Sequence, residues 1–282
     1  MSKIIAIIKN FFKPSWNSPR SYSKINLLTE FSDFKPHGNQ DYKSFEPLVI
    51  KNIQQILPKI SNLIDIHEPL LFKPYIDFYN ESNINGKLDK MLELQNDQFL
   101  YFGSDKTSVH NYHYIYTSLF PDRNVNFNLL EIGLGTNNPK IVSSMGTKGK
   151  PGASIRAFKE IYQNASIYGA DVDENILFQE DRIKTMKVDQ NDLESLLKLD
   201  TFDTKFDLVI DDGLHYQLSN LNTLIYALNS LNKGGYLVIE DIGSWTLDTW
   251  KVVNFILSKY YKTQIIEMTK TNYIFLLQKV KP

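Results

Sequence analysis

Downstream of residue 124, the hydrophobic positions alternate between short continuous runs and runs with a helical period. Short continuous runs are typical of buried parallel strands, and they lie at 128–133, 166–171, 183–188, 206–211 and 236–240. Apolar residues three or four positions apart predict helices at 154–163, 193–197, 219–231 and 246–260. Two final runs, 263–268 and 273–279, flank a polar turn and predict a hairpin. This alternation predicts a mainly parallel α/β sheet with helices on both faces.

Upstream of residue 124 the pattern is irregular. Residues 12–40 are rich in Ser, Pro, Asn and aromatic residues and predict a loop. Helical periods at 46–66, 87–94 and 111–119 predict three helices. We therefore expect two parts, which are a mainly helical extension of residues 1–99 that serves substrate binding or assembly, and a catalytic domain of residues 100–282.

Composition narrows the class of protein. The 282 residues include 31 basic and 32 acidic side chains, a net charge of -1, which gives no electrostatic reason to expect a nucleic-acid partner. Cysteine is absent, which excludes disulfides, thiolate zinc sites and cysteine nucleophiles. No apolar run approaches the roughly 20 residues of a membrane-spanning helix. The cytosol is the expected compartment.

The first 13 residues are basic, with Lys3, Lys9 and Lys13 around a short apolar core. Two interpretations stay open for this segment. The favoured one is a helix that packs on its own protein or on a partner subunit, and the other is weak contact with an anionic membrane surface. Because residues before 100 are rich in Ile and aromatic side chains, we also expect a homo-oligomer, in the simplest case a dimer.

The first predicted strand ends in a glycine turn with an acid before it. Glu131, Gly133 and Gly135 form an E-x-G-x-G pattern, and the glycines let backbone approach a ligand closely. A dinucleotide site would have a third glycine where Asn138 stands. The pattern therefore favours S-adenosylmethionine, whose amino-acid tail is held by backbone and carboxylate groups.

Acids also follow the next two predicted strands. Asp171, with Asp173 two residues later, is suited to accept hydrogen bonds from both ribose hydroxyls of an adenosine ligand. Asp189 and Gln190 are expected to meet the adenine edge. A single acid of this kind is as easily a helix cap, but acids at three successive strand ends favour a ligand site.

The fourth and fifth strands end in a carboxylate cluster. Asp212, Glu240 and Asp241 are expected to converge, since these strands are neighbours in such a sheet. Oxygen ligands without sulfur favour a hard cation such as Mg²⁺. His215 is placed to act as a general base on a substrate bound there, an interpretation we prefer to a structural histidine.

The segment 103–114 lies just before the first strand. His110 and His113 give only two nitrogen ligands, so a cover over the cofactor is favoured over a zinc site. Tyr112 and Tyr116 are expected to be packing residues.

Five motifs resemble class I S-adenosylmethionine-dependent methyltransferases, namely LLEIGLG (129–135), GASI (152–155), YGAD (168–171), DDGLH (211–215) and VIED (238–241). Within that class, the D-G-x-H and E-D motifs resemble metal-dependent sugar O-methyltransferases of the macrolide-tailoring mycinamicin type and of bacterial surface-polysaccharide clusters. The likeness covers roughly residues 100–280.

The resemblance implies a Rossmann-like, seven-stranded α/β methyltransferase sheet with helices on both faces and a mainly helical N-terminal extension. It implies S-adenosylmethionine as cofactor, with Asn138, Ser154 and Asp211 added to its site. It further implies Mg²⁺ on Asp212, Glu240 and Asp241, and catalysis by His215 and Asp212. The implied acceptor is a sugar or nucleotide-linked sugar.

Other functions stay open beside this one. They are a methyltransferase for a small non-sugar metabolite, a non-catalytic subunit on the same fold, a dehydrogenase, and an iron oxygenase that uses His110 or His113. Residues 136–151 make the first loop longer than usual, and we expect this loop to close over the cofactor or the acceptor.

Overall fold

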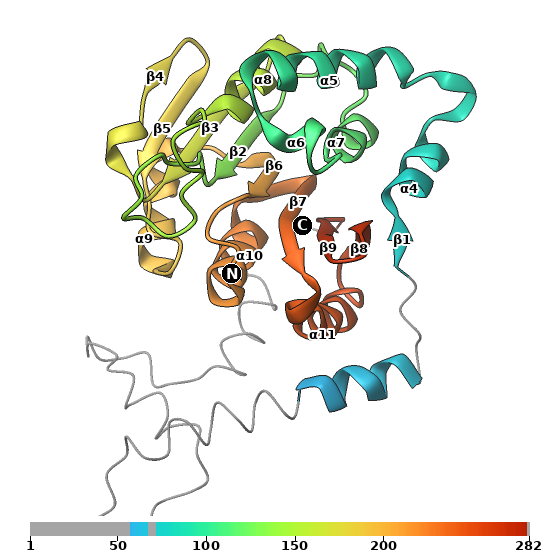
Figure 1. Cartoon of the computed structure of the whole chain (residues 1–282). Coiled ribbons are helices and arrows are strands. Elements are labelled where there is room, and N and C mark those ends of the chain that lie inside the picture. The colour runs from blue at the N-terminus through green and yellow to red at the C-terminus, as the bar shows by residue number, and fades with distance from the viewer. Residues whose placement is uncertain (1–56, 67–71, 281–282) are drawn as a thin grey trace, which may run out of the picture. The chain divides into compact units, whose positions relative to one another are not determined.

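The computed structural model of the chain describes residues 57–66 and 72–280 (Figure 1). The basic N-terminal segment and the loop expected at 12–40 lie outside the described residues. Of the helix expected over 46–66, residues 57–66 are described, and they are helical. Residues 60–282 make up one compact unit, and the sheet and its helices belong to it. Within the described residues, no helix combines the length and apolar character needed to cross a bilayer.

One nine-stranded sheet runs through the compact unit in the order β1-β8-β9-β7-β6-β2-β3-β5-β4. The strands are β1 (Lys73–Pro74), β2 (Asn128–Ile132), β3 (Ser166–Asp171), β4 (Gln179–Glu180), β5 (Ile183–Lys187), β6 (Phe206–Asp211), β7 (Leu231–Gly243), β8 (Lys262–Thr269) and β9 (Asn272–Gln278). All seven predicted strands are present, so the predicted fold is confirmed. The strand number is higher than predicted because β1 and β4, at the sheet edges, have two residues each and carry no periodic signal.

The central strands place the loop after β2 at a switch point. β2 pairs in parallel with β3 on one side and with β6 on the other, and its last residue, Ile132, lies opposite Ala170 and Asp211. The chain continues from β2 toward β3 and β5, then returns to β6 and β7. In such a sheet, a crevice forms where the chain connections leave a strand toward opposite sides of the sheet, at the carboxyl ends of the strands.

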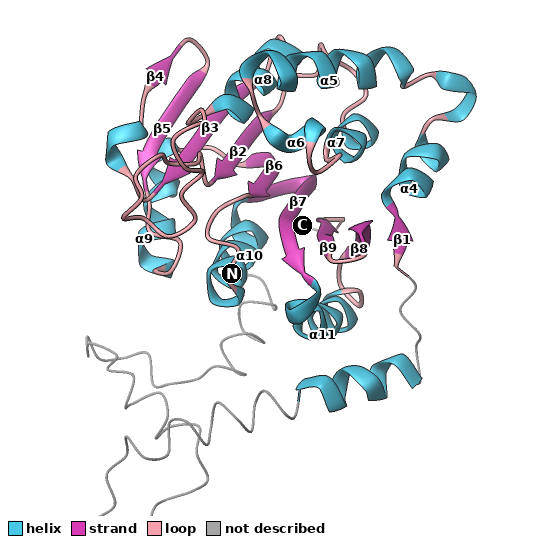
Figure 2. Cartoon of the chain, viewed as in Figure 1, coloured by secondary structure: helices cyan, strands magenta, loops and turns pink. Residues whose placement is uncertain are grey.

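Helices cover both faces of the sheet, with α5, α7 and α8 on one face and α10 and α11 on the other (Figure 2). The helices are α4 (Tyr75–Ser82), α5 (Asp89–Phe102), α6 (Asp105–Ser108), α7 (His113–Leu119), α8 (Ala153–Ile161), α9 (Leu193–Leu197), α10 (Gln217–Ser230) and α11 (Leu247–Leu257), with short 3-10 turns η2 (Ile84–Gly86), η3 (Glu174–Ile176), η4 (Lys198–Phe202) and η5 (Ser244–Thr246). The ring of Phe158 in α8 meets Phe99 of α5 and Tyr116 of α7 edge-on, each at 5.1 Å between ring centroids. These buried aromatic contacts bind the upstream helices to the sheet.

Three differences from the predicted elements have physical causes. α5 extends to Phe102, beyond the predicted 87–94, because its second half is buried against α8 at Phe99. β7 begins at Leu231, before the predicted 236–240, since Leu231 pairs with Phe206 despite the polar, glycine-rich residues that follow it. α4 and α6 are too short for a clear helical period.

Residues 73–99, which belong to the predicted extension, take part in the sheet and its helical layer. β1 pairs in parallel with β8, and α4 and α5 contact α7 and α8. The compact unit begins at Ile60. The functional division between residues 99 and 100 stays a prediction.

His113 offers a test of this packing. It opens α7 with 6% of its surface exposed, and its Nδ1 has no hydrogen-bond partner among the described residues. Burial lowers the pKa of His113 from the usual 6.5 to about 4, because the charged ring is poorly solvated there. The folded state thus binds this proton less readily than the unfolded chain, so stability is complete above about pH 6.5 and falls as the pH drops toward 4.

Between pH 6.5 and 4.5, we expect the unfolding free energy of His113→Gln to fall by roughly 1–3 kcal/mol less than that of the wild type. The measurement is urea unfolding of both proteins across that range. Carboxylates contribute equally to the pH dependence of both proteins, so the difference between the two curves of unfolding free energy against pH reports His113 alone. Identical pH dependence in the two proteins would contradict the burial argument.

Candidate cofactor and metal site

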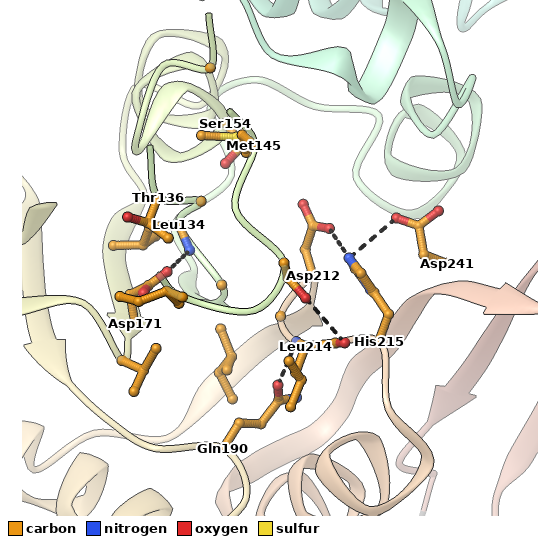
Figure 3. Close-up of a pocket in the computed structure, with 18 of the residues that line it drawn as sticks. Leu134, Thr136, Met145, Ser154, Asp171, Gln190, Asp212, Leu214, His215 and Asp241 are labelled. Carbon is orange, nitrogen blue, oxygen red and sulfur yellow. Dashed lines mark hydrogen bonds and ion pairs between the residues drawn. The ribbon is translucent and has the colours of Figure 1, made fainter. Parts of the chain in front are cut away.

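A cavity of about 990 Å³ opens at the carboxyl ends of the central strands (Figure 3). Its walls come from the loops after β2, β3, β5 and β6, from β7, and from the segment around α6. The predicted site residues that line it are Gly133, Gly135, Ser154, Asp171, Asp189, Gln190, Asp212, His215 and Asp241. The predicted site residues that are absent from its lining are Glu131, Asn138, Asp173, Asp211 and Glu240. The cavity thus lies where the sheet topology places a ligand.

The glycine turn after β2 packs directly against the loop after β6. Gly133 has φ +95°, and a Cβ atom there would overlap the carbonyl oxygen of Asp212. Asp212 in turn donates its backbone N–H to the carbonyl of Ile132 at 2.9 Å. Glycine is therefore required at this point both for conformation and for space.

Asp171 fixes the turn from the end of β3. Its Oδ2 accepts a hydrogen bond from the backbone N–H of Leu134 at 2.8 Å (Figure 3). Its Oδ1 accepts one from the backbone N–H of Asp173 at 2.9 Å. Asp173 accepts a second bond to the same turn, from the Thr136 hydroxyl at 2.5 Å. Hydrogen bonds from Thr136 and Asn175 lower the pKa of Asp173. Asp171 therefore faces the cavity, whereas Asp173 acts on the turn from behind it.

Gln190 supports the loop after β6. Its Nε2 donates to Asp211 Oδ1 at 2.6 Å. Its Oε1 accepts the backbone N–H of Leu214 at 2.9 Å (Figure 3). Asp211 is fully buried, and its other oxygen accepts from Asn220 at 3.1 Å. These contacts hold the 211–214 loop in place. Ligand contact by Gln190 and Asp211 stays a prediction.

Two further predicted residues have roles inside the protein. Asn138 caps a local turn, since its Oδ1 accepts from the backbone N–H of Lys140 at 3.1 Å. Glu131 is fully buried and accepts from Ser154 Oγ at 2.8 Å, so Ser154 lies between Glu131 and the cavity. Asp189 is exposed at the cavity rim and accepts from the N–H of Asn191.

The long first loop contributes part of the cavity wall. Its residues there are Ile141, Val142, Ser143, Met145, Lys148, Gly149 and Lys150. Met145 lies over Gly135, where a Cβ atom would overlap its side chain. Ser143 Oγ donates to the carbonyl of Leu214 at 3.3 Å, beside His215. The loop thus joins the glycine turn to the loop that carries the predicted base.

Asp212, His215 and Asp241 converge at one side of the cavity (Figure 3). One ligand atom from each lies within 4.8 Å of the others, and His215 Nε2 is 3.8 Å from both Asp212 Oδ1 and Asp241 Oδ2. His215 and Asp241 both have φ +54°, an uncommon backbone conformation that is enriched at functional sites. The sequence predicted that Asp212, Glu240 and Asp241 converge with His215 within reach of a substrate bound there, and the structure brings Asp212, Asp241 and His215 together.

Each carboxylate of this group has one oxygen bound by the protein and one turned toward His215. Asp212 Oδ2 accepts from Lys106 Nζ at 2.8 Å, which leaves Oδ1 on the His215 side. Asp241 Oδ1 accepts from Tyr112 at 2.8 Å and from Asn272 at 2.7 Å, which leaves Oδ2 on that side. The two remaining oxygens are oriented toward one point, as ligands of a single cation would be.

Glu240, the third predicted metal ligand, lies apart from this group. It is fully buried, its Oε2 accepts from Lys106 Nζ at 2.5 Å, and its Oε1 accepts from the Tyr116 hydroxyl. Burial raises the pKa of Glu240, while Lys106 opposes that rise. A ligand role for Glu240 stays a prediction, since both of its oxygens are bonded within the protein.

Lys106 was not predicted as a site residue. Its side chain is 1% exposed, and its ammonium group also lies 3.2 Å from Glu131 Oε1. Burial by itself would lower the pKa of Lys106, but Asp212, Glu240 and Glu131 together raise it well above the usual value. Tyr112 and Tyr116 were predicted to pack, which they do, and their hydroxyls also donate to Asp241 and Glu240. Hydrophobic periodicity gives no signal for such polar contacts.

His110 and His113 separate in the structure. His110 lines the cavity, where its Nε2 is 3.6 Å from Asp105 and its Nδ1 is 3.4 Å from Asp241. The neighbouring carboxylate of Asp105 raises the pKa of His110, because it stabilises the charged ring. Because His113 is buried in the first turn of α7, the two rings do not form a metal site together.

The strand order, the glycine turn after β2 and the cavity at the switch point define a class I methyltransferase fold. The MycE methyltransferase from the mycinamycin biosynthetic pathway, solved with Mg and SAH, has a TM-score of 0.53 at 24% sequence identity and covers 66% of this chain and 54% of that chain. A further crystal of that enzyme also contains mycinamycin VI. The likeness confirms the predicted fold.

Two relatives give the chemical context of this fold. The 8-demethyl-8-alpha-L-rhamnosyl tetracenomycin-C 2'-O-methyltransferase of Streptomyces olivaceus is 31% identical over 141 residues, which is 50% of this chain and 35% of that protein. Demethylmacrocin O-methyltransferase of Streptomyces fradiae is 36% identical over 126 residues, which is 44% of this chain and 29% of that protein. The match thus spans about a third of each relative. No protein-family profile matches the chain.

The close approach at Gly133 gives a prediction with a matched control. Gly234 has a similar φ of +88°, but a Cβ atom there would meet nothing within 4 Å. Gly234→Ala is expected to cost about 1–2 kcal/mol of unfolding free energy for the backbone conformation alone. Gly133→Ala is expected to cost about 1–3 kcal/mol more, because the Asp212 backbone has to move. Urea unfolding measures both, and equal costs would disprove the close approach.

Proposed function

We propose that the chain is an S-adenosylmethionine-dependent O-methyltransferase that acts on a sugar hydroxyl with the help of Mg²⁺. One observation carries the proposal, namely that Asp212, Asp241 and His215 open into the same cavity as the glycine turn. The Streptomyces olivaceus relative, whose name gives a rhamnosyl tetracenomycin as its substrate, supports the sugar acceptor. We also propose that the acceptor is a glycan or a nucleotide-linked sugar, as in surface-polysaccharide synthesis.

The cavity fits the proposed cofactor by its size and by its polar groups. Its volume of about 990 Å³ is at the upper end of the range usual for ligand pockets, which is room for a cofactor and an acceptor together. The glycine turn would approach the amino-acid tail, and Asp171 would accept the ribose hydroxyls, since each carboxylate oxygen has a lone pair beyond its backbone bond. S-adenosylmethionine supplies a methyl group on a positively charged sulfur.

The cation fits the oxygens of Asp212 and Asp241 that face His215. These oxygens form a hard donor set, and Tyr112, Asn272 and Lys106 bind the other oxygen of each carboxylate. Bound Mg²⁺ lowers the pKa of a hydroxyl that it contacts. The 21–33% exposure of the three side chains leaves them accessible to an acceptor.

His215 is proposed to take the proton from the acceptor hydroxyl. Its Nε2 faces both carboxylates and the cavity, while its Nδ1 is buried without a hydrogen-bond partner among the described residues. A sugar hydroxyl is a weak nucleophile at neutral pH, so a base within reach of it is needed for transfer. Asp212 would act beside His215 by keeping the cation at that place.

The activity can be tested by mass spectrometry. Incubated with S-adenosylmethionine, Mg²⁺ and a panel of nucleotide sugars and rhamnosyl glycosides, the protein is expected to add one methyl group to an acceptor. EDTA should abolish the product and added Mg²⁺ should restore it. His215→Ala is expected to lose roughly 10²–10⁴-fold in turnover.

The His215→Ala variant also distinguishes a general base from a metal ligand. If His215 is a general base, His215→Ala should bind Mn²⁺ about as tightly as the wild type does. If His215 is a third metal ligand, the variant should bind Mn²⁺ much more weakly. Full activity in EDTA would remove the cation from the mechanism. An unchanged rate in His215→Ala would give that residue a structural role only.

The cofactor assignment has its own test. Asp171→Ala is expected to weaken binding of S-adenosylhomocysteine by about 10–100-fold, which corresponds to 1–3 kcal/mol for unpaired hydroxyl groups. Calorimetry measures it. Thr136→Val serves as control, because it loosens the same turn through Asp173 without removing the carboxylate, and its effect should be smaller. Tighter binding of NAD than of S-adenosylhomocysteine would refute the assignment.

A further inference from the structure

Lys106 is fixed on both sides before its side chain enters the site. Its backbone N–H donates to Ser104 Oγ at 3.4 Å, and its carbonyl accepts from the N–H of Tyr112 at 2.7 Å. The next residue, Thr107, donates to Asn96 in α5 at 2.6 Å. Because α6 is held to its neighbours in this way, the position of the ammonium group is determined by the fold.

The ammonium group joins three neighbouring strands. Its carboxylate partners are Glu131 in β2 at 3.2 Å, Asp212 after β6 at 2.8 Å and Glu240 in β7 at 2.5 Å. The contacts with Asp212 and Glu240 are hydrogen bonds, and the contact with Glu131 is an ion pair. Lys106, Glu131 and Glu240 are almost fully buried. Asp212 is the partly exposed member, with 25% of its side chain accessible.

The contact with Lys106 gives the two carboxylate oxygens of Asp212 different environments. The Oδ2 atom is bound by Lys106, and Oδ1 is left 3.8 Å from His215 Nε2. Asp241 shows the same division, with Tyr112 and Asn272 in the place of the lysine. A carboxylate that is bound through one oxygen presents the other in a fixed direction, as is usual for metal ligands supported by outer contacts.

We propose that Lys106 is the positioning residue of the cation site, which holds Asp212 so that its Oδ1 faces Asp241 and His215. Glu131 and Glu240 serve to fix the lysine, with Glu240 itself held by Tyr116. The inference rests on the proposed function, since the cation is the one proposed there. It adds that a residue outside the five central strands sets the geometry of the ligand.

Electrostatics alone gives the opposite expectation, which makes the proposal testable. Removing a positive charge beside Asp212 would strengthen cation binding by charge alone. Removing a positioning residue weakens it, and the loss of an outer partner of a metal ligand usually costs 10–100-fold in affinity. The direction of the change therefore separates the two effects.

The experiment measures binding of Mn²⁺ alone by electron paramagnetic resonance, with the full chain. Lys106→Met is expected to bind Mn²⁺ about 10–100-fold more weakly than the wild type. Lys148→Met is the control, because Lys148 lines the same cavity and has no carboxylate within 4.0 Å in the described part of the chain. It should bind Mn²⁺ as the wild type does or slightly more tightly.

Circular dichroism shows whether Lys106→Met folds. Lys106→Arg is a second variant, which keeps the positive charge and so tests the proposal even if Lys106→Met does not fold. Since the guanidinium fork is larger and planar, it would displace Asp212, so we expect weaker binding, roughly 10-fold, and a changed Mn²⁺ spectrum. Wild-type affinity in Lys106→Arg, or tighter binding in folded Lys106→Met, would overturn the inference and leave the proposed function intact. A wild-type protein that binds no Mn²⁺ would overturn both.

Discussion

Mutual repulsion of carboxylates is the constraint on which this site depends. Acids stand at the ends of β2, β3, β6 and β7, and each would be costly to keep charged beside the others without compensation. The protein compensates them one by one. Backbone N–H groups bind Asp171, amide side chains bind Asp211, and Lys106 is shared by Glu131, Asp212 and Glu240. The compensation leaves Asp212 and Asp241 each with one oxygen directed at His215, so the same contacts that allow burial also select the atoms that face the cavity.

The site is shaped as much by backbone contacts as by charge. The turn after β2 packs on the loop after β6 at Gly133, and Gln190 and Ser143 fasten that loop from two further directions. Three loops that would be mobile alone are thus held by each other and by the strand ends. Such support is needed to keep His215 and Asp241 in their uncommon backbone conformations, which are stable only where the surroundings impose them.

The sequence predicted most of the sheet because its central strands are continuous apolar runs, which stand out from polar loops. It also predicted that Asp212, Glu240 and Asp241 converge near His215, since the positions of strand ends follow from topology, and Asp212 and Asp241 do meet at His215. It missed β1 and β4, which have two residues each, and the first part of β7, where the pairing of Leu231 outweighs a polar, glycine-rich sequence. It missed Lys106 for another reason. A lysine in a short polar segment looks exposed, and only the three-dimensional fold reveals the three acids around it.

The segment before the first central strand is therefore part of the site. The five central strands and their loops supply the glycine turn and the acids. Lys106, His110 and Tyr112 come from upstream, and they bind or approach Asp212 and Asp241. The buried contacts of Phe99 and Tyr116 with Phe158 hold that segment in place. A change in the packing of α5 or α7 would thus reach the carboxylates through Lys106 and Tyr112, which ties the geometry of the site to helices whose described residues do not line the cavity.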